Sequence, residues 1–317
     1  MQILLRKERK NMIYVWLVVG FVLLIKGADF LVEGSSAVAK LLKIPAVVIG
    51  LTIVAMGTSA PEAAVSITAG LAGNNDIAIG NIIGSNIFNL LVVVGVCAVM
   101  KGVATDKDIL KRDMPVNIGI SALLLLFLMD LKITRIEGII LLILFVVYMI
   151  IVVGEGVKNR TEQEEEVKSL SPLISIVYIL GGLAAVVFGG NLVVDNASEI
   201  ARNFGLSQNL IGLTIVAVGT SLPELVTSIV ATRKGESGLA LGNAVGSCIF
   251  NILFILGMSG TLSPMMATGE SLVDICVLTV VTIMMFLFGK TKGMTSRVEG
   301  AICILVYVGY LTYAVMR

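Results

Sequence analysis

The sequence predicts an all-α integral membrane protein with ten transmembrane helices, arranged as two inverted repeats of five helices. Two observations predict this class. The 317 residues are 57% hydrophobic and only 14% charged, with a mean hydropathy of +1.00, whereas soluble proteins carry about 25% charged residues. The chain also contains two pairs of nearly identical motifs with the same separation. The composition excludes a soluble enzyme and a disordered chain, and a net charge of +1 offers no basic surface for nucleic acid.

The predicted helices follow from the length of the apolar stretches. A helix needs about 20 apolar residues to cross the hydrocarbon core of a membrane. Such stretches occur near 13–37, 45–71, 77–100, 114–130, 135–154, 172–199, 208–232, 238–262, 271–289 and 298–316. The polar stretch 155–171 separates five of them from five. We expect a solvated linker there, between a first repeat at 13–154 and a second at 172–317.

The distribution of lysine and arginine predicts the orientation in a cell membrane. Most loop cations lie on the face that holds the 155–171 linker, as Lys107, Arg160 and Lys290 do. The opposite face carries few, among them Lys132 and Arg202. Because cytoplasmic loops carry the excess of positive residues, we expect a cytoplasmic linker and both termini outside.

The two repeated motifs indicate internal duplication. Residues 49–62 read IGLTIVAMGTSAPE and residues 211–224 read IGLTIVAVGTSLPE. Residues 80–89 read GNIIGSNIFN and residues 242–251 read GNAVGSCIFN, with the same offset. Since each half has an odd number of predicted helices, the second copy must be upside down relative to the first. Inverted repeats are typical of secondary transporters, whose substrate site lies near the middle of the membrane.

The first motif places an acid and a proline deep in an apolar segment, twice. Glu62 and Glu224 should lie well within the membrane, where a charged side chain costs about 2.5–3.5 kcal/mol on insertion scales. Pro61 and Pro223 have no amide hydrogen, so the carbonyl four residues earlier loses its helical partner. Non-helical backbone at this depth is tolerated where it is buried in protein or lines a wet cavity. The motif therefore predicts a cluster of carboxylate, hydroxyl and carbonyl oxygens.

The second motif predicts a facing wall of polar side chains. Residues spaced by four lie near one helical face, and this spacing relates Asn81, Ser85 and Asn89, and again Asn243, Ser247 and Asn251. The glycine pairs Gly80–Gly84 and Gly242–Gly246 favour close packing of helices. The alternative is that the whole motif only packs helices together. We favour a functional role for Asn89 and Asn251, because a buried amide beside buried acids needs a partner.

The available side chains restrict the chemistry of the site. The chain has no histidine, which removes histidine-based acid–base catalysis and His-containing triads. The four cysteines show no CxxC spacing, so we expect buried packing residues. Oxygen-only ligation suits Ca²⁺ and Na⁺, and disfavours soft transition metals. We therefore expect Ca²⁺ and Na⁺ as transported ions and the lipid bilayer as a partner. We expect no cofactor, no nucleic acid and no obligate protein partner.

At these motifs the sequence resembles the cation/Ca²⁺ exchanger superfamily, in particular its prokaryotic sodium/calcium exchanger-like branch. GTSxPE and GNxxGSxxxN, each present twice, match the alpha-repeats of that family over essentially the whole chain. The resemblance implies that the repeats form two central helix pairs, with six further helices as scaffold. It also implies that Glu62 and Glu224 are the central ligands. The remaining ligands implied are the main-chain oxygens of Ala55, Thr58, Ala217 and Thr220, together with Ser59, Ser85, Ser221, Ser247, Asn89 and Asn251.

The leading functional prediction is a secondary antiporter that exchanges Ca²⁺ for Na⁺ by alternating access. GTSxPE in place of Gly-Asn-x-x-Glu favours Na⁺ coupling by resemblance, and Asn251, where K⁺-dependent relatives have aspartate, argues against K⁺ co-transport. The alternative is a Ca²⁺/H⁺ antiporter, because carboxylates in a low-dielectric site can hold a proton. A cation channel and an intramembrane hydrolase that uses Ser59 or Ser221 are weaker alternatives. The short loops offer no filter segment, and no histidine supports the serines.

Overall fold

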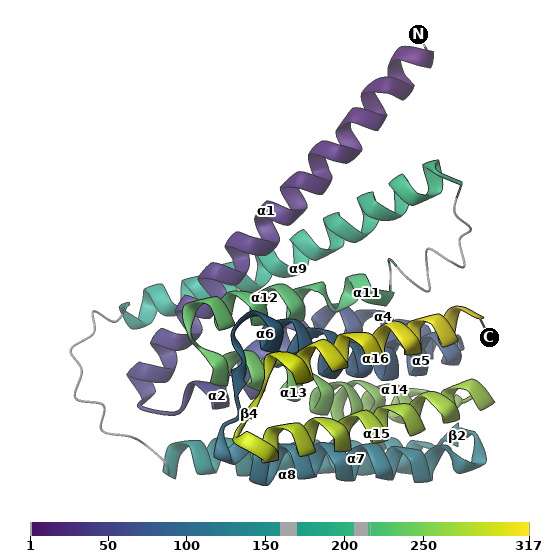
Figure 1. The fold of residues 1–317 in the computed structure, drawn as a ribbon. Coiled ribbons are helices and arrows are strands. Elements are labelled where there is room, and N and C mark those ends of the chain that lie inside the picture. Colours follow the sequence, from purple (N-terminus) through teal and green to yellow (C-terminus); the bar gives the residue numbers. More distant parts are fainter. Residues whose placement is uncertain (1, 159–169, 206–214, 216, 317) are drawn as a thin grey trace.

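A computed structural model describes residues 2–158, 170–205, 215 and 217–316 of the chain, and it is almost entirely helical (Figure 1). Eight helices in this described part are long and apolar enough to cross a membrane, which confirms the all-α membrane class. Several of them run through short π-helical or 3₁₀ turns. They are α1 (Gln2–Leu42), α5–η2–α6 (Asn75–Phe88, Asn89–Val93, Val94–Lys101), η3–α7–η4 (Ile109–Asp113, Met114–Phe127, Leu128–Asp130), α8 (Arg135–Lys158), α9 (Pro172–Asn203), α13–η6–α14 (Ser237–Phe250, Asn251–Leu256, Gly257–Leu262), α15 (Gly269–Lys292) and α16 (Arg297–Met316).

A ninth span, which occupies the predicted stretch 45–71, is broken just before the proline of the first motif. It consists of α2 (Ala46–Ile49), η1 (Gly50–Val54) and α3 (Ala55–Thr58), followed after a bend of 50° by α4 (Ala60–Leu71). The break lies at Ser59, whose φ of −80° and ψ of 11° leave the helical region. Pro61 follows at the second position of α4, where its missing amide hydrogen costs no hydrogen bond.

The corresponding span of the second half is only partly described. The predicted span 208–232 begins in a segment, 206–214 and 216, that lies outside the described residues. Its later part repeats the break of the first half, because α11 (Ala217–Thr220) and α12 (Leu222–Lys234) meet at Ser221. The predicted count of ten helices is therefore matched by eight helices and one bent pair in the described residues, and the tenth stays a prediction. The linker segment 159–169 also lies outside them.

Two spans form the centre of the molecule. In α5–η2–α6 and α13–η6–α14, 78% and 94% of the most apolar stretch is buried, against 11–39% in the other six. The outer helices expose large apolar side chains, such as Ile136 at 71% and Leu305 at 70%. Exposed apolar surface of this extent marks contact with lipid. The two central spans are the ones that carry the GNxxGSxxxN motif.

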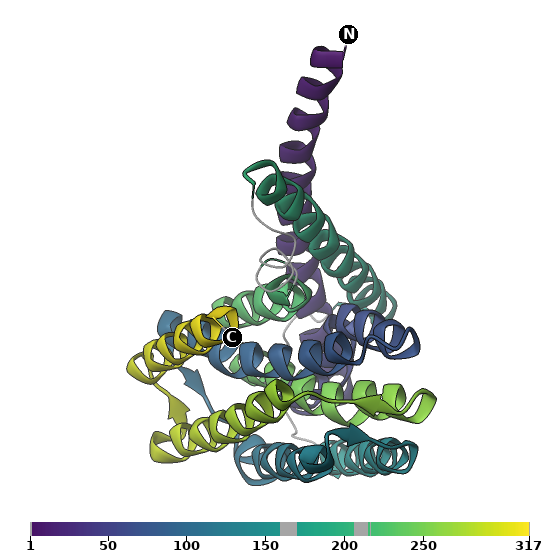
Figure 2. The ribbon, with the colours of Figure 1, turned by 90° about the vertical axis from the view of Figure 1, so that its right-hand side faces the viewer.

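Helices α1 and α9 lie side by side and lean away from the other helices (Figures 1 and 2). Their contact is lined by glycines seven residues apart, Gly20 and Gly27 on α1, and Gly182 and Gly189 on α9. A Cβ atom on Gly27 would lie 2.8 Å from the Gly182 carbonyl oxygen, and one on Gly189 would lie 2.8 Å from that of Gly20. Only glycine allows the two backbones to approach this closely.

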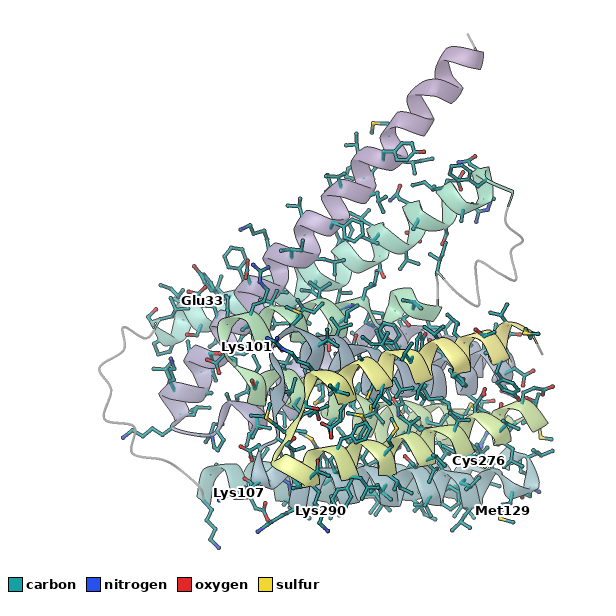
Figure 3. The ribbon with its side chains drawn as sticks, in the orientation of Figure 1. Glu33, Lys101, Lys107, Met129, Cys276 and Lys290 are labelled. Atoms are coloured by element: carbon teal, nitrogen blue, oxygen red, sulfur yellow. The ribbon has the colours of Figure 1, made fainter. Side chains whose placement is uncertain are left out.

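Two short antiparallel strand pairs join loops from the two halves. Strands β1 (Val103–Ala104) and β4 (Met294–Thr295) form one pair, and β2 (Lys132–Ile133) and β3 (Met265–Met266) form the other. The pairs lie at opposite ends of the span that contains α7. Figure 3 shows Lys101, Lys107 and Lys290 toward the end with β1 and β4, and Met129 toward the other end. The loops that were predicted to share a face, those with Lys107 and Lys290, thus lie at one end of the molecule, and the loop after Met129 lies at the other.

The two glycine pairs of the second motif behave differently. Cβ atoms on Gly242 and Gly246 would each lie 2.7 Å from main-chain oxygens of α2 and η1, so the close packing predicted for this pair is confirmed. Cβ atoms on Gly80 and Gly84 would have no neighbour within 4 Å among the described residues. The segment of the second half that matches α2 and η1 is mostly outside the described residues. Close packing is therefore seen for one pair only.

Candidate functional site

Glu62 is fully buried in the first turn of α4, directly after the break at Ser59. Its Oε1 accepts a hydrogen bond of 2.9 Å from Ser221 Oγ and a longer one of 3.5 Å from Ser85 Oγ. The position is favourable for a carboxylate, because the unpaired amides and the dipole of a helix make its N-terminus positive. The bend that begins α4 thus supplies part of the stabilisation that a buried acid needs.

Glu224 has the same environment with the two halves exchanged. It is fully buried in the first turn of α12. Its Oε1 accepts from Ser59 Oγ at 2.8 Å and from Ser247 Oγ at 3.5 Å. Each glutamate is therefore held most closely by the serine that precedes the other glutamate. The two motifs form one site because each supplies the hydrogen-bond donor that the other lacks.

Each glutamate keeps one carboxylate oxygen without a hydrogen-bond partner. Oε2 of Glu62 and Oε2 of Glu224 are buried, and neither has a partner among the described residues. A buried carboxylate oxygen without a partner is costly, and a bound cation would remove that cost. The two free oxygens are the strongest indication that the site binds positive ions.

Asn81 fixes the backbone around Glu62. Its Nδ2 donates to Ser66 Oγ at 2.9 Å and, at 3.5 Å, to the Glu62 carbonyl oxygen. Its Oδ1 accepts from Thr220 Oγ1 at 3.5 Å. Both the nitrogen and the oxygen of the Asn81 amide are hydrogen-bonded within the protein. Asn81 therefore holds the backbone at Glu62 in place. Ser66 did not appear among the sequence candidates.

Asn243 has the equivalent position at Glu224. Its Nδ2 donates to Ser228 Oγ at 3.0 Å and to the Glu224 carbonyl oxygen at 3.3 Å, and its Oδ1 accepts from Thr58 Oγ1 at 3.1 Å. Ser228 was also missed by sequence reasoning. The signal that could have found both serines is the motif offset, which relates Ser66 to Ser228 as it relates the two glutamates.

Asn89 and Asn251 each begin a π-helical turn in the middle of a central span. Such turns are uncommon and frequently occur at functional sites. Both side chains are fully buried. Both polar atoms of the Asn89 amide lack a partner among the described residues, as does Oδ1 of Asn251. The second motif therefore adds two buried amide oxygens that have no partner among the described residues.

The predicted main-chain ligands lie at the ends of the two short helices before the breaks. Ala55 and Thr58 are the first and last residues of α3, and Ala217 and Thr220 are those of α11. The Ala55 carbonyl oxygen accepts from Ser247 Oγ of the other half at 3.4 Å. The same carbonyl oxygen also accepts from the Ser59 amide at 3.1 Å, across the end of α3. The Ala55 oxygen is therefore shared between its own helix and a serine of the other half.

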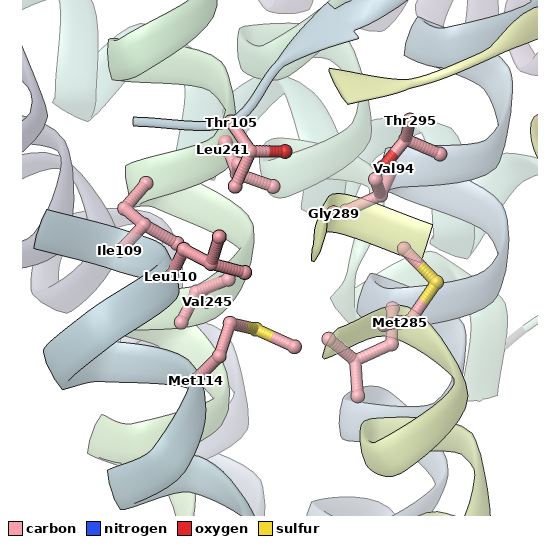
Figure 4. Close-up of a pocket in the computed structure, with 11 residues that line it drawn as sticks. Val94, Thr105, Ile109, Leu110, Met114, Leu241, Val245, Met285, Gly289 and Thr295 are labelled. Atoms are coloured by element: carbon pink, nitrogen blue, oxygen red, sulfur yellow. The ribbon is translucent and has the colours of Figure 1, made fainter. Parts of the chain in front are cut away.

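Two further observations concern other places in the described residues where an ion could bind: clusters of acidic side chains and a small cavity. Among the described residues, no three His, Cys, Asp or Glu side chains gather into a metal-binding group, so the candidate site has two acids and otherwise neutral oxygens. A cavity of about 10 Å³ beside the start of α7 is lined mostly by apolar side chains, including Ile109, Met114 and Met285 (Figure 4). That volume is at the limit for a single water molecule.

One buried ionic cluster was not predicted. Asp113 is fully buried and accepts hydrogen bonds from Arg112 Nε at 2.7 Å and from Tyr148 Oη at 3.0 Å. Arg112 also binds Glu155 at 2.7 Å. Arg112 and Asp113 lie in the π-helical turn Ile109–Asp113, which continues into α7. The cluster joins this turn to α8 and belongs to the scaffold.

Comparisons with known proteins agree with this arrangement. The family described as Sodium/calcium exchanger protein matches residues 12–154 and again residues 174–316. A protein of Alkalimonas amylolytica named as an antiporter, CaxA, is 41% identical over 308 residues, which cover 93% of this chain and 96% of that protein. The sodium/calcium exchanger MaX1 of Methanosarcina acetivorans is 32% identical over 93% of this chain and 96% of its own length.

The fold is also similar to solved structures. The sodium-calcium exchanger NCX_Mj, in a crystal soaked with 2.5 mM Na⁺ and 10 mM Sr²⁺, matches with a TM-score of 0.86 at 32% sequence identity. The match covers 96% of this chain and 99% of that one. A match of this extent includes both halves of the chain.

Proposed function

Because the chain belongs to the sodium/calcium exchanger family, we propose that it is a secondary antiporter that exchanges Ca²⁺ for Na⁺ across the membrane by alternating access. The observation that carries this proposal is the reciprocal contact of the two motifs. Each buried glutamate accepts a hydrogen bond from a serine of the other half and leaves one oxygen unpaired. A site that is built from both halves changes shape whenever one half moves against the other.

The residues around the two glutamates suit hard cations. Ca²⁺ takes six to eight oxygen ligands, and two carboxylates balance its charge. Na⁺ uses the same oxygens, so each ion displaces the other, and only a neutralised site would cross between the two access states. We assign as ligands Glu62, Glu224, Asn89, Asn251, Ser59, Ser85, Ser221, Ser247 and the main-chain oxygens of Ala55, Thr58, Ala217 and Thr220.

The proposed architecture is two inverted repeats, residues 13–154 and 172–317, joined by the linker 155–171. The strand pairs β1–β4 and β2–β3 support this division, because each pair joins one strand from each half. We place the linker in the cytoplasm and both termini outside, on the distribution of lysine and arginine. The ion site then lies where the halves meet.

A Ca²⁺/H⁺ antiporter is the alternative. It is favoured by the two fully buried carboxylates, because a proton can neutralise an acid in a low-dielectric site as a cation does. The two functions differ only in the ion that replaces Ca²⁺.

Gradient-driven flux separates the two functions. The purified protein is reconstituted into liposomes, and Ca²⁺ uptake is followed with an outward Na⁺ gradient, an outward K⁺ gradient or a pH gradient imposed separately. We expect uptake with the Na⁺ gradient alone, abolished by a Na⁺ ionophore. Protein-free liposomes are the control. Uptake driven by the pH gradient in the absence of Na⁺ would establish the alternative.

A further inference from the structure

A buried chain of hydrogen bonds connects the two central spans beside the candidate site. Asn86 Nδ2, on α5, donates to the main-chain oxygen of Cys248 on α13 at 3.0 Å. Asn251 Nδ2, at the start of η6, donates to Asn86 Oδ1 at 3.0 Å. All three residues are fully buried, and Oδ1 of Asn251 has no partner among the described residues.

The first acceptor in this chain fixes the direction of every later bond. A main-chain carbonyl oxygen can only accept, so the Asn86 atom beside Cys248 must be the amide nitrogen. The Asn86 oxygen is then turned toward Asn251, and it requires a donor there. The nitrogen of the Asn251 amide meets that requirement, and its oxygen faces away from Asn86. The backbone of α13 thus determines, through one side chain, which way the Asn251 amide points.

We infer that Asn86 is a positioning residue that presents the oxygen of Asn251, and not its amide nitrogen, to the bound cation. This inference rests on the proposed function, since it takes Asn251 as a ligand. Asn251 lies one helical turn after Ser247, whose hydroxyl contacts Glu224. A reversed amide would point N–H donors at a positive ion, and those donors cannot ligate it.

The other half lacks this device. The offset that relates the two motifs places Cys248 at the position equivalent to Asn86. Its thiol contacts the Asn86 main-chain oxygen at 3.7 Å, and a thiol cannot act as an amide relay. Accordingly, neither polar atom of Asn89 has a partner among the described residues. One asparagine of the site is oriented in advance, and its counterpart is not.

The relay also selects the chemistry at position 251. Because Asn86 offers an acceptor, the partner must offer a hydrogen. An ionised aspartate there would set two acceptors against each other. The neutral amide of Asn251 therefore satisfies the relay and leaves the site with two acids.

The experiment measures equilibrium Ca²⁺ binding to the purified full-length protein, so it needs no ion gradient. The variants are Asn86→Leu, Asn251→Ala and the double variant. We expect Asn86→Leu to weaken Ca²⁺ binding about tenfold, the change that loss of roughly one hydrogen bond produces. In the Asn251→Ala background, Asn86→Leu should change the affinity by less than about twofold, because residues that act through one another are not additive. Asn117→Leu, which removes an equally buried amide from α7, should leave binding unchanged.

The outcomes are distinct. Unchanged affinity in Asn86→Leu, or the same loss with and without Asn251, overturns the positioning role and leaves the proposed function intact. A wild-type protein that binds no Ca²⁺ overturns both. If Asn86→Leu does not fold, Asn86→Ser, whose short hydroxyl cannot span both partners, provides the same comparison.

Discussion

At the scale of single residues, the two glutamates show how an acid is kept inside a membrane protein. Each lies at the positive N-terminus of a helix that starts at a break, and each accepts a short hydrogen bond from a serine of the other half. Asn81 and Asn243 tie the adjoining backbone to the central spans. The second carboxylate oxygen of each glutamate has no partner in the described part of the chain, so a cation can bind there.

The first prediction concerns these acids. Glu62→Gln and Glu224→Gln should each abolish Ca²⁺ transport, because a single carboxylate does not balance a divalent ion. Glutamine keeps the shape and can still accept from the serine, so folded protein should remain in the membrane. Transport is measured as Ca²⁺ flux in proteoliposomes. Glu155→Gln, a half-exposed acid at the end of α8, is the control and should keep its flux. Wild-type exchange by either glutamine variant of the site would remove it from the ligand set.

At the scale of secondary-structure elements, the helices of the site are interrupted at or near the predicted oxygen ligands. The breaks at Ser59 and Ser221 end α3 and α11, and the π-helical turns η2 and η6 begin at the two asparagines. The supporting helices α1 and α9 are uninterrupted over 41 and 32 residues. They contact each other through glycines, and this contact depends on the absence of side chains.

The second prediction concerns that helix pair. A Cβ atom on Gly182 would lie 2.6 Å from the Leu31 amide nitrogen, whereas one on Gly181 would have no described neighbour within 4 Å. Gly182→Val should therefore lower stability by about 1–3 kcal/mol, the usual cost of overpacking. Gly181→Val is the matched control and should be tolerated. Thermal unfolding of the detergent-solubilised proteins makes the comparison. Equal unfolding temperatures for the two variants would refute close contact of α1 and α9.

At the scale of the whole molecule, the two halves are interleaved. Each strand pair, and each short serine–glutamate bond, takes one member from each half. The strand pairs lie at opposite ends of α7, and the longest helices are on the outside. Movement of one half relative to the other would therefore change the serine–glutamate hydrogen bonds.

The third prediction tests the orientation of the spans. Lys107→Cys, Lys132→Cys and Lys290→Cys are made in a protein whose exposed Cys276 is replaced by serine. A thiol reagent that does not cross membranes should label position 132 in intact cells. Positions 107 and 290 should be labelled only after the membrane is opened. Labelling of 132 and 107 from the same side would contradict the predicted odd number of spans in each half.

The fourth prediction is that transport moves net charge. Two acids balance one Ca²⁺, and the surplus neutral oxygens provide room for additional Na⁺ ions. Each net charge moved contributes about 2.3 kcal/mol per 100 mV of membrane potential. Clamping the potential of proteoliposomes with a K⁺ ionophore, at a constant Na⁺ gradient, should therefore change the Ca²⁺ flux. Identical flux at zero and at strongly negative potential would show electroneutral exchange.

Much of the candidate site was predictable from the sequence. The glutamates, the prolines before them and the polar residues of the second motif occur twice at one offset, inside segments that are otherwise apolar. Ser66 and Ser228 obey the same offset but lie outside the motifs. Asn86 has no polar equivalent in the second half, so no repeat could point to it. The residues that surround Asp113 belong to no repeated motif, so the sequence did not indicate that they form a cluster.

The sequence by itself determined the membrane class, the duplication and the two repeated acids. Long apolar stretches satisfy their main-chain hydrogen bonds in lipid as helices, and an acid within such a stretch is costly and therefore rare. Only the tertiary structure decided which groups meet. Ser59 bonds Glu224 across 165 residues, and Ser221 bonds Glu62 across 159. The direction of the Asn251 amide depends on a carbonyl oxygen of α13 that acts through Asn86 on α5. Hydropathy is a property of each segment alone, whereas a hydrogen bond depends on the position of both partners in space.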